Sequence, residues 1–232
     1  MKALLEVFYQ PGKLFASLPE RKFAWVAPLI AVALLTVLAF YLLPHYMGRE
    51  NLARQQMAAY ARNLTPEQMQ QAVERSTSPV QIYVGYAMAL IAGAVTMLAL
   101  AGLLMAFGMM TKKAPSFGTM LAMVCLANFP YSVVLVLMTW LTLAISPDPA
   151  SLDFRNLLAT NVGAFLNKNE TSKGLYSLMT SLDILTFVEI FLLSLGFSKV
   201  TKSGLGAGLF AVGVLWIFWV LAKMGLALAF GN

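Results

Sequence analysis

Two acidic residues interrupt one of the most apolar stretches of the chain, the segment SLDILTFVEIF at positions 181–191. Carboxyl groups in apolar surroundings can hold a proton, bind a cation, or act together as a general acid and a general base. Asp183 and Glu189 are six residues apart, which places their side chains about 120° apart around a helix. They therefore do not form a paired-carboxylate site, and each acid needs a partner elsewhere in the chain.

The other side chains offer little catalytic chemistry. The sequence has one histidine, His45, and one cysteine, Cys125, and it contains no nucleophile–base pair, no cluster of metal ligands and no phosphate-binding loop. His45 follows Pro44 just after an apolar run, where an interfacial residue is more common than a metal ligand. We predict that the protein is not an enzyme and that it holds neither a metal nor a cofactor.

The composition is that of an integral membrane protein. Of the 232 residues, 59% are hydrophobic and only 11% are charged, and the mean hydropathy is +0.75. A helix that crosses a bilayer takes about 20 apolar residues, and five continuous runs are this long. We place the spans at residues 23–43, 80–110, 117–144, 182–200 and 205–230. The first run is longer than the apolar core of a cleavable signal, so we expect it to be a retained span.

The distribution of basic residues predicts the orientation. With five spans the termini lie on opposite sides, and the side richer in Lys and Arg faces the cytoplasm. The N-terminal segment and the short connections after the second and fourth spans carry eight basic residues: Lys2, Lys13, Arg21, Lys22, Lys112, Lys113, Lys199 and Lys202. The two longer loops carry seven over about twice the length, which places the N-terminus in the cytoplasm and the C-terminus outside. The net charge of +6 suits anionic headgroups rather than nucleic acid, because no basic cluster alternates with aromatic residues.

Short amphipathic helices are expected outside the spans. Residues 1–22 form a cytoplasmic segment whose apolar residues flank Pro11, which is typical of two short helices lying on the inner membrane surface, although an ordinary cytoplasmic lead-in fits as well. In the first outer loop, Thr65 followed by Pro66 is a helix start. In the second, apolar residues recur at helical spacing through residues 151–167.

The predicted fold class is therefore an all-α integral membrane protein. It is a five-span helical bundle with short amphipathic helices in the N-terminal segment and in the two outer loops. The spans and loops together form one membrane domain, residues 23–232.

Depth within the membrane distinguishes the two acids. At about 1.5 Å per residue, Glu189 lies roughly 16 Å from the inner end of its span, near the middle of the bilayer, and Asn128 lies roughly 18 Å up the third span. Pro130 follows Asn128 closely and loosens that helix. Glu189, Asn128 and Pro130 could form a polar site that responds to protons or ions. A protonated Glu189 that makes a single packing hydrogen bond explains the same residues.

Asp183 lies at a shallower depth. It is roughly 25 Å from the inner end of its span, and Lys223 of the last span reaches roughly 27 Å. We predict a structural ion pair between Asp183 and Lys223, with Asp183 also favoured by its place in the first turn of a helix.

Small residues indicate where helices can approach one another. Gly85, Ala89 and Gly93 recur every four residues in the second span, and the last span begins GLGAGLF. Such faces let helix backbones come close in lipid, although small residues are also simply abundant in membrane helices.

Several segments resemble one family. The resemblance is carried by the segment SFGTMLAMVCLANFP, by the long outer loop that follows, and by SLDILTFVEIFLLSLGFSKVTKSG before an apolar last span. The N-terminal PGKLFASLPE leading into FAWVAPL fits the same pattern. The resemblance is to bacterial members of the Yip (Ypt/Rab-interacting protein) domain family. The motif-matched positions are Phe117, Gly118, Pro130, Asp183 and Gly196. The chain departs from the pattern at Val188, where relatives often carry an aromatic residue, and at Glu189, where the pattern has no acid.

The resemblance implies five spans, a cytoplasmic N-terminus and a place in the bacterial inner (plasma) membrane. Eukaryotic relatives are associated with Rab GTPases and vesicle traffic, but a shared fold does not transfer a partner.

Two functions remain open. The first is a membrane scaffold or accessory subunit for partner membrane proteins or lipids, which would associate through the small-residue faces. The alternative is a small transporter or channel with a proton- or ion-responsive site at Glu189. One acid in the membrane, and the lack of matching Gly/Pro breaks at the midplane, favour the scaffold. A homo-oligomer is compatible with either function.

Overall fold

The computed structural model describes residues 2–60, 65–111, 115–168 and 170–230. This part of the chain is helical, with no β-strand in it. The α-helices are α1 (Lys2–Tyr9), α2 (Pro11–Ser17), α3 (Val26–Met47), α4 (Arg49–Tyr60), α5 (Pro66–Ser76), α6 (Pro79–Met109), α7 (Phe117–Ile145), α8 (Lys173–Ser181), α9 (Ile184–Val200) and α10 (Leu205–Phe230). Short 3-10 helices are η1 (Leu18–Glu20), η2 (Pro149–Ser151), η3 (Phe154–Asn156) and η4 (Val162–Phe165).

Four helices of the described chain are long and apolar enough to cross a membrane: α3, α6, α7 and α10. Their ends lie within a few residues of the predicted spans. The predicted span at 182–200 corresponds to α9, which has only 17 residues. At about 1.5 Å per residue it is about 25 Å long, somewhat short of a bilayer core of roughly 30 Å. Four candidate spans are therefore shown, and the fifth stays a prediction.

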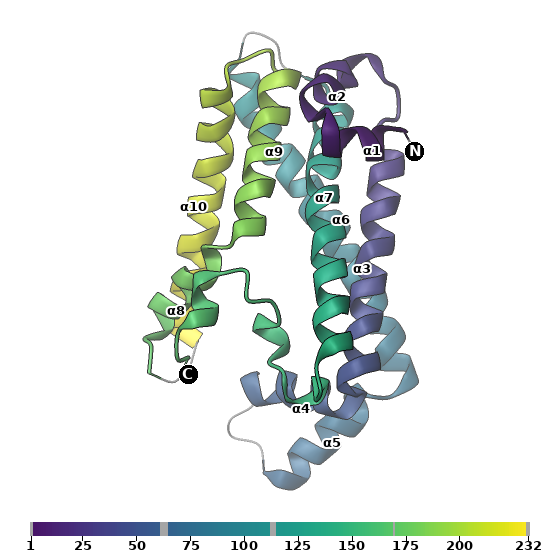
Figure 1. Ribbon diagram of the computed structural model, residues 1–232, viewed down its shortest axis with the longest axis vertical. Helices are drawn as coiled ribbons and strands as arrows, with labels where there is room; N and C mark the ends of the chain where they lie inside the picture. The colour runs from purple at the N-terminus through teal and green to yellow at the C-terminus, as the bar shows by residue number, and fades with distance from the viewer. Residues whose placement is uncertain (1, 61–64, 112–114, 169, 231–232) are drawn as a thin grey trace.

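Helix α7 lies at the centre of the bundle (Figure 1). It packs against α3, α6 and α9, and α10 covers the other side of α9. Among the four long helices it is the most buried. The end of the bundle that holds the N-terminus also holds the connections after α6 and α9, and α10 runs from there toward the other end (Figure 1). Lys112 and Lys113, which contribute to the predicted orientation, lie outside the described residues.

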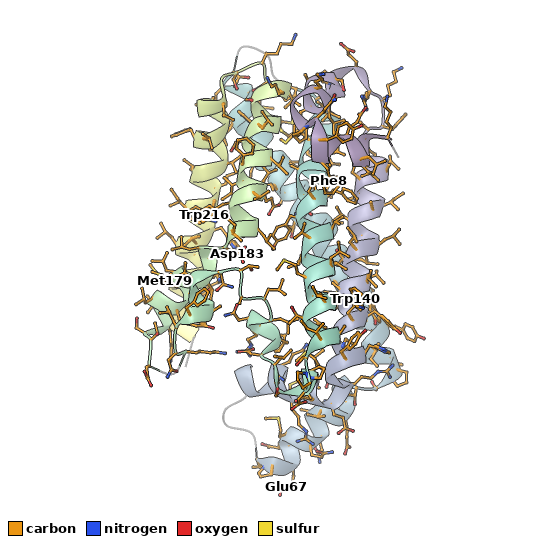
Figure 2. All side chains as sticks on the ribbon, viewed as in Figure 1. Phe8, Glu67, Trp140, Met179, Asp183 and Trp216 are labelled. Carbon is orange, nitrogen blue, oxygen red and sulfur yellow. The ribbon has the colours of Figure 1, made fainter. Side chains whose placement is uncertain are left out.

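The N-terminal segment folds into the bundle. It forms two helices, α1 and α2, as expected, and part of their apolar surface packs against the bundle. Val7, Leu14 and Phe15 are buried in the same core as α7 and α9, and Phe8 contacts Phe129 of α7 edge-on, with ring centroids 5.9 Å apart. Figure 2 shows Phe8 beside α7. Leu5 and Tyr9 of α1 remain 66% and 62% exposed, so the predicted contact of this segment with the inner membrane surface stays a prediction.

The first outer loop contains the helix expected after Thr65, α5, and a second helix, α4, before it. Helix α5 begins at Thr65, whose hydroxyl accepts a hydrogen bond from Gln68 N–H while the Gln68 side chain accepts one from Thr65 N–H. This reciprocal capping satisfies two backbone donors that a helix start otherwise leaves without partners. Glu67 lies in the same first turn, at the far end of the bundle (Figure 2).

The second outer loop differs from the prediction. In place of a helix through residues 151–167, the chain forms the turns η2, η3 and η4. Asp153 and Asn161 cap these turns by accepting hydrogen bonds from backbone N–H groups two or three residues later. Such local hydrogen bonds compete with helix formation, so apolar residues at helical spacing do not by themselves predict a helix here.

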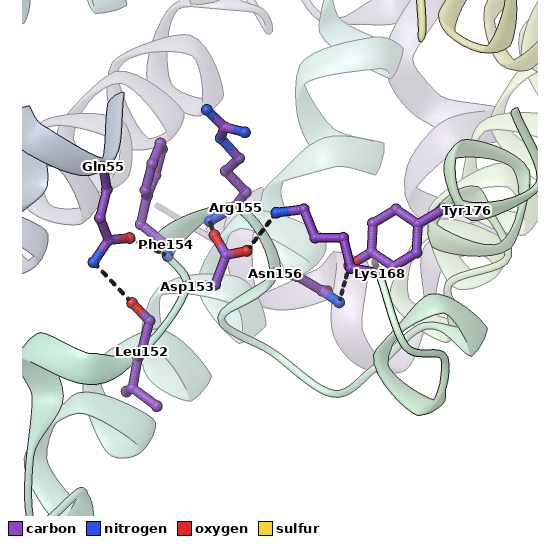
Figure 3. A network of polar contacts seen from close by, with 8 residues as sticks. All are labelled: Gln55, Leu152, Asp153, Phe154, Arg155, Asn156, Lys168 and Tyr176. Atoms are coloured by element: carbon purple, nitrogen blue, oxygen red, sulfur yellow. Dashed lines mark hydrogen bonds and ion pairs between the residues drawn. The ribbon is translucent and has the colours of Figure 1, made fainter. Parts of the chain in front are cut away.

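Polar contacts fasten this loop to the first one (Figure 3). Gln55 of α4 donates a hydrogen bond to the Leu152 carbonyl at 3.1 Å and accepts one from Phe154 N–H at 3.4 Å. Within the second loop, Lys168 forms an ion pair with Asp153 at 2.8 Å. Burial alone would raise the pKa of Asp153, but the hydrogen bonds from Lys168 and from Arg155 N–H lower it below its ordinary value. The two outer loops therefore form one connected layer.

Two glycines set the distances between the helices of the bundle. At Gly196 of α9 an added Cβ would lie 2.6 Å from Met123 Cγ of α7. At Gly208 of α10 an added Cβ would overlap the carbonyl oxygen of Ser194 in α9. The predicted close approach at GLGAGLF is thus made by Gly208. The small residues Gly85, Ala89 and Gly93 of α6 make no such close approach within the described part of the chain. No other described part of the structure lies within 4 Å of a Cβ added at Gly85 or Gly93.

We predict that Gly208→Ala destabilises the bundle. The new methyl group would meet backbone rather than a flexible side chain, so α10 must move away from α9, at a cost of about 1–3 kcal/mol. The measurement is the midpoint of thermal unfolding in detergent. Gly213→Ala is the matched control, since it adds the same group to the same helix where space is open. Equal midpoints for the two variants would contradict the α9–α10 packing.

Candidate functional site

The structure brings Glu189 and Asn128 together. Asn128 Nδ2 of α7 donates a hydrogen bond to Glu189 Oε1 of α9 at 2.7 Å. Ser132 Oγ, one turn further along α7, donates to Asn128 Oδ1 at 2.9 Å. The amide therefore uses both of its polar ends, and a short polar chain crosses the α7–α9 contact. Ser132 was not identified from the sequence, although its spacing of four residues from Asn128 is the signal that could have found it.

Pro130 lies beside this polar chain and makes a different contribution. Helix α7 continues through it without a break, and its ring lines an apolar cavity of about 270 Å³ between the N-terminal helices, α7 and α9. The cavity walls are Val7, Phe8, Pro11, Pro130, Tyr131, Val134, Leu185, Val188 and Leu192. Leu185, Val188 and Leu192 flank Glu189 on α9, so the carboxyl group lies between an apolar cavity and a buried amide.

Asp183 and Lys223 form no ion pair, so the predicted pair is corrected for these two described residues. Asp183 is the residue that caps α9: its Oδ1 accepts hydrogen bonds from Leu185 N–H at 2.7 Å and Thr186 N–H at 3.3 Å. Its Oδ2 accepts a hydrogen bond from Thr160 of the second outer loop at 2.7 Å. Three donors satisfy the carboxylate where the helix begins, and the loop is held against the start of α9. Figure 2 shows Asp183 at this position.

Lys223 of α10 interacts with a different element. Its Nζ donates hydrogen bonds to Thr180 Oγ1 at 3.1 Å and to Ser181 Oγ at 3.2 Å, at the C-terminal end of α8. A cation at that end of a helix is favoured by the exposed carbonyl groups and the helix dipole. Thr160, Thr180 and Ser181 are thus the partners that depth estimates did not reveal. They complete a second polar region, at the break between α8 and α9.

The arrangement is a hydrogen-bonded contact between α7 and α9. Glu189 has an amide donor and apolar neighbours, which is a setting for a carboxyl group that is either a packing partner or a responsive group. Among the described residues, no group of three or more His, Cys, Asp or Glu side chains could hold a metal ion.

The apolar helices and their all-helical packing define a multi-pass membrane protein. Comparison with family models gives the more specific assignment: the model of the Yip1 domain matches residues 5–229. The chain belongs to the Yip1 domain family. No curated protein and no solved structure was found to match it.

We predict that Asn128→Ala destabilises the α7–α9 contact, while Glu189→Gln does not. The alanine leaves the Glu189 carboxyl and the Ser132 hydroxyl without their partner, whereas glutamine keeps an oxygen that accepts from Asn128 Nδ2. Hydrogen bonds inside membrane bundles are worth about 0.6 kcal/mol on average and up to about 1.7. The measurement is thermal unfolding in detergent for Glu189→Gln, Asn128→Ala, Glu189→Leu and the Asn128→Ala/Glu189→Leu double variant. Full additivity in that cycle would show that the two side chains are not coupled.

Proposed function

We propose that this Yip1-family protein is a non-enzymatic membrane scaffold or accessory subunit that holds a partner membrane protein. The observation that carries the proposal is the small-residue face of α6, which the described part of the chain covers only partly. The buried residues of α6, Met97, Ala101, Leu104 and Gly108, all lie in its second half. In the first half, Gly85 and Gly93 have no neighbour that an added Cβ would meet within 4 Å.

This half of α6 offers what a second transmembrane helix needs. Gly85, Ala89 and Gly93 are spaced four residues apart and so share one face, where a helix backbone can approach closely. Because lipid provides no hydrophobic drive for association, such a close contact is the main source of affinity between apolar helices. The occupant is a helix of another membrane protein, with a second copy of this chain as the other candidate.

The proposed location is a bacterial inner membrane, with the N-terminus in the cytoplasm and the C-terminus outside. The basic residues of the N-terminal segment and of the α9–α10 connection support this orientation. They gather at one end of the bundle (Figure 1).

We predict opposite labelling of two cysteine variants. Gly204→Cys lies in the connection before α10, where space is open, and Glu170→Cys lies at an exposed position of the second outer loop. An impermeant maleimide should label Glu170→Cys in intact spheroplasts, and Gly204→Cys only after the membrane is opened. The native Cys125 is buried, so unmodified protein is the control. The reverse pattern would overturn the orientation.

The Asn128–Glu189 hydrogen bond favours a second candidate function, a small transporter or channel with a proton- or ion-responsive site. A carboxyl group near the middle of a membrane bundle, held by a single amide, could bind and release a proton. This function predicts flux that depends on Glu189 in the protein without any partner.

We predict that a stoichiometric membrane partner co-purifies with the full chain from native membranes in mild detergent, as identified by mass spectrometry. Gly85→Leu/Gly93→Leu should lose that partner, because bulky side chains would keep the two helices apart. Gly102→Leu is the control: it fills open space on α6, nine residues from Gly93 and thus about 180° around the helix.

A partner retained by Gly85→Leu/Gly93→Leu would contradict the role of this face. A homo-oligomer with no other protein would contradict the accessory function. Ion and proton flux would then be compared in vesicles containing the wild type or Glu189→Gln. A wild-type flux lost in the variant would establish the second candidate, and a fully active variant would end it.

A further inference from the structure

A second cavity lies between the chain that leads into α3 and the start of α7. Its volume is about 290 Å³, and it is lined from two directions. The chain that leads into α3 contributes Arg21, Lys22 and Trp25, and the start of α7 contributes Ser116, Gly118 and Thr119. The function proposed above does not use this cavity.

The charged side chains of the cavity wall are both cations. Arg21 Nη2 lies 3.5 Å from Glu6 Oε2 of α1, a contact too long for a strong hydrogen bond, so most donors of the guanidinium remain available. Lys22 is exposed and makes no ion pair within the described part of the chain. Glu6 offsets part of one charge, and the cavity keeps an excess of positive charge. Two flexible cations beside one cavity suit an anion with several oxygen atoms, such as a phosphate group.

The polar groups of α7 add to this preference. Ser116 caps the helix, and its hydroxyl contacts both Thr119 N–H and Thr119 Oγ1. The amino end of a 29-residue helix therefore faces the same cavity as Arg21 and Lys22. Backbone N–H groups at such an end favour negative charge and reinforce the side-chain cations.

The depth of the cavity indicates where the phosphate comes from. Two apolar helices that can cross a membrane, α3 and α7, both begin at its wall. The cavity thus lies at the level where the apolar part of the bundle starts, which is the level of lipid headgroups. Trp25 lines it, and Phe23 beside it is 75% exposed. Aromatic residues favour this boundary.

We propose that this cavity binds the phosphate group of an anionic phospholipid on the side of the membrane that holds the N-terminus. Arg21 and Lys22 contact the phosphate oxygens, the start of α7 supplies hydrogen-bond donors, and Trp25 packs against the glycerol region. The site is independent of the proposed scaffold role, because it uses no residue of the α6 face.

The test is native mass spectrometry of the full chain in mild detergent, titrated with phosphatidylglycerol and, in parallel, with phosphatidylcholine. We expect Arg21→Ala/Lys22→Ala to weaken phosphatidylglycerol binding on the order of tenfold or more, since each basic residue near a membrane surface contributes about 1 kcal/mol. Lys13→Ala/Lys202→Ala is the matched control. It removes the same charge from exposed residues of the same end that do not line the cavity, and its affinity should stay close to that of the wild type.

A second variant tests the cavity with the charges kept. A Cβ at Gly118 would make only ordinary contact with Trp25, at 3.8 Å, so Gly118→Leu fills the space without a backbone clash. It should weaken phosphatidylglycerol binding while the protein stays monodisperse.

Competition by inorganic phosphate identifies the source of the phosphate group. If inorganic phosphate displaces the lipid, the same site also accepts a soluble phosphate, and the phosphate-binding chemistry stands. Equal losses in the two double variants, or equal affinity for phosphatidylglycerol and phosphatidylcholine in the wild type, would overturn the proposal.

Discussion

The packing of α9 between α7 and α10 is the contact on which the rest of the structure depends. Apolar surface alone does not drive helices together in lipid, so their separation is set by how closely the backbones can approach. Gly196 allows α9 to approach Met123 of α7, and Gly208 allows α10 to approach the Ser194 carbonyl of α9. Once α9 is held at this distance, Glu189 reaches Asn128, and α2 packs against the inner part of α9. The Asn128–Glu189 hydrogen bond is thus a consequence of close backbone packing.

The sequence predicts the long helices well because membrane helices are defined by a continuous property, the length of an apolar run. It predicts helix α5 for a different reason: Thr65 and Pro66 act through local hydrogen bonds and a fixed backbone angle, which need no tertiary contact. The same local effects explain why the helix predicted for the second outer loop is not found. Asp153 and Asn161 also bond locally, but they stabilise tight turns, and the apolar spacing around them does not reveal which conformation gains more.

Partners of buried polar groups are harder to predict than depths. Glu189 and Asn128 were matched correctly because each is almost alone at its depth, so few other pairings exist. Asp183 and Lys223 also share a depth, yet the carboxylate is satisfied by backbone N–H groups two and three residues away and by Thr160. A hydrogen bond from a neighbouring residue fixes little extra chain, whereas an ion pair between two helices must immobilise a long lysine side chain. A buried carboxylate is therefore satisfied by hydrogen-bond donors of neighbouring residues wherever such donors are present.

The two ends of the molecule offer different surfaces for interaction. At the N-terminal end, α1 buries Val7 and α2 buries Leu14 and Phe15 in the core of the bundle. At the opposite end, the first half of α6 leaves its small-residue face only partly covered, with open space beside Gly85 and Gly93. Surfaces open to another transmembrane helix thus lie far along the bundle from the cationic cavity at Arg21 and Lys22. A partner helix and an anionic lipid could therefore bind at the same time, since neither occupies the surface that the other requires.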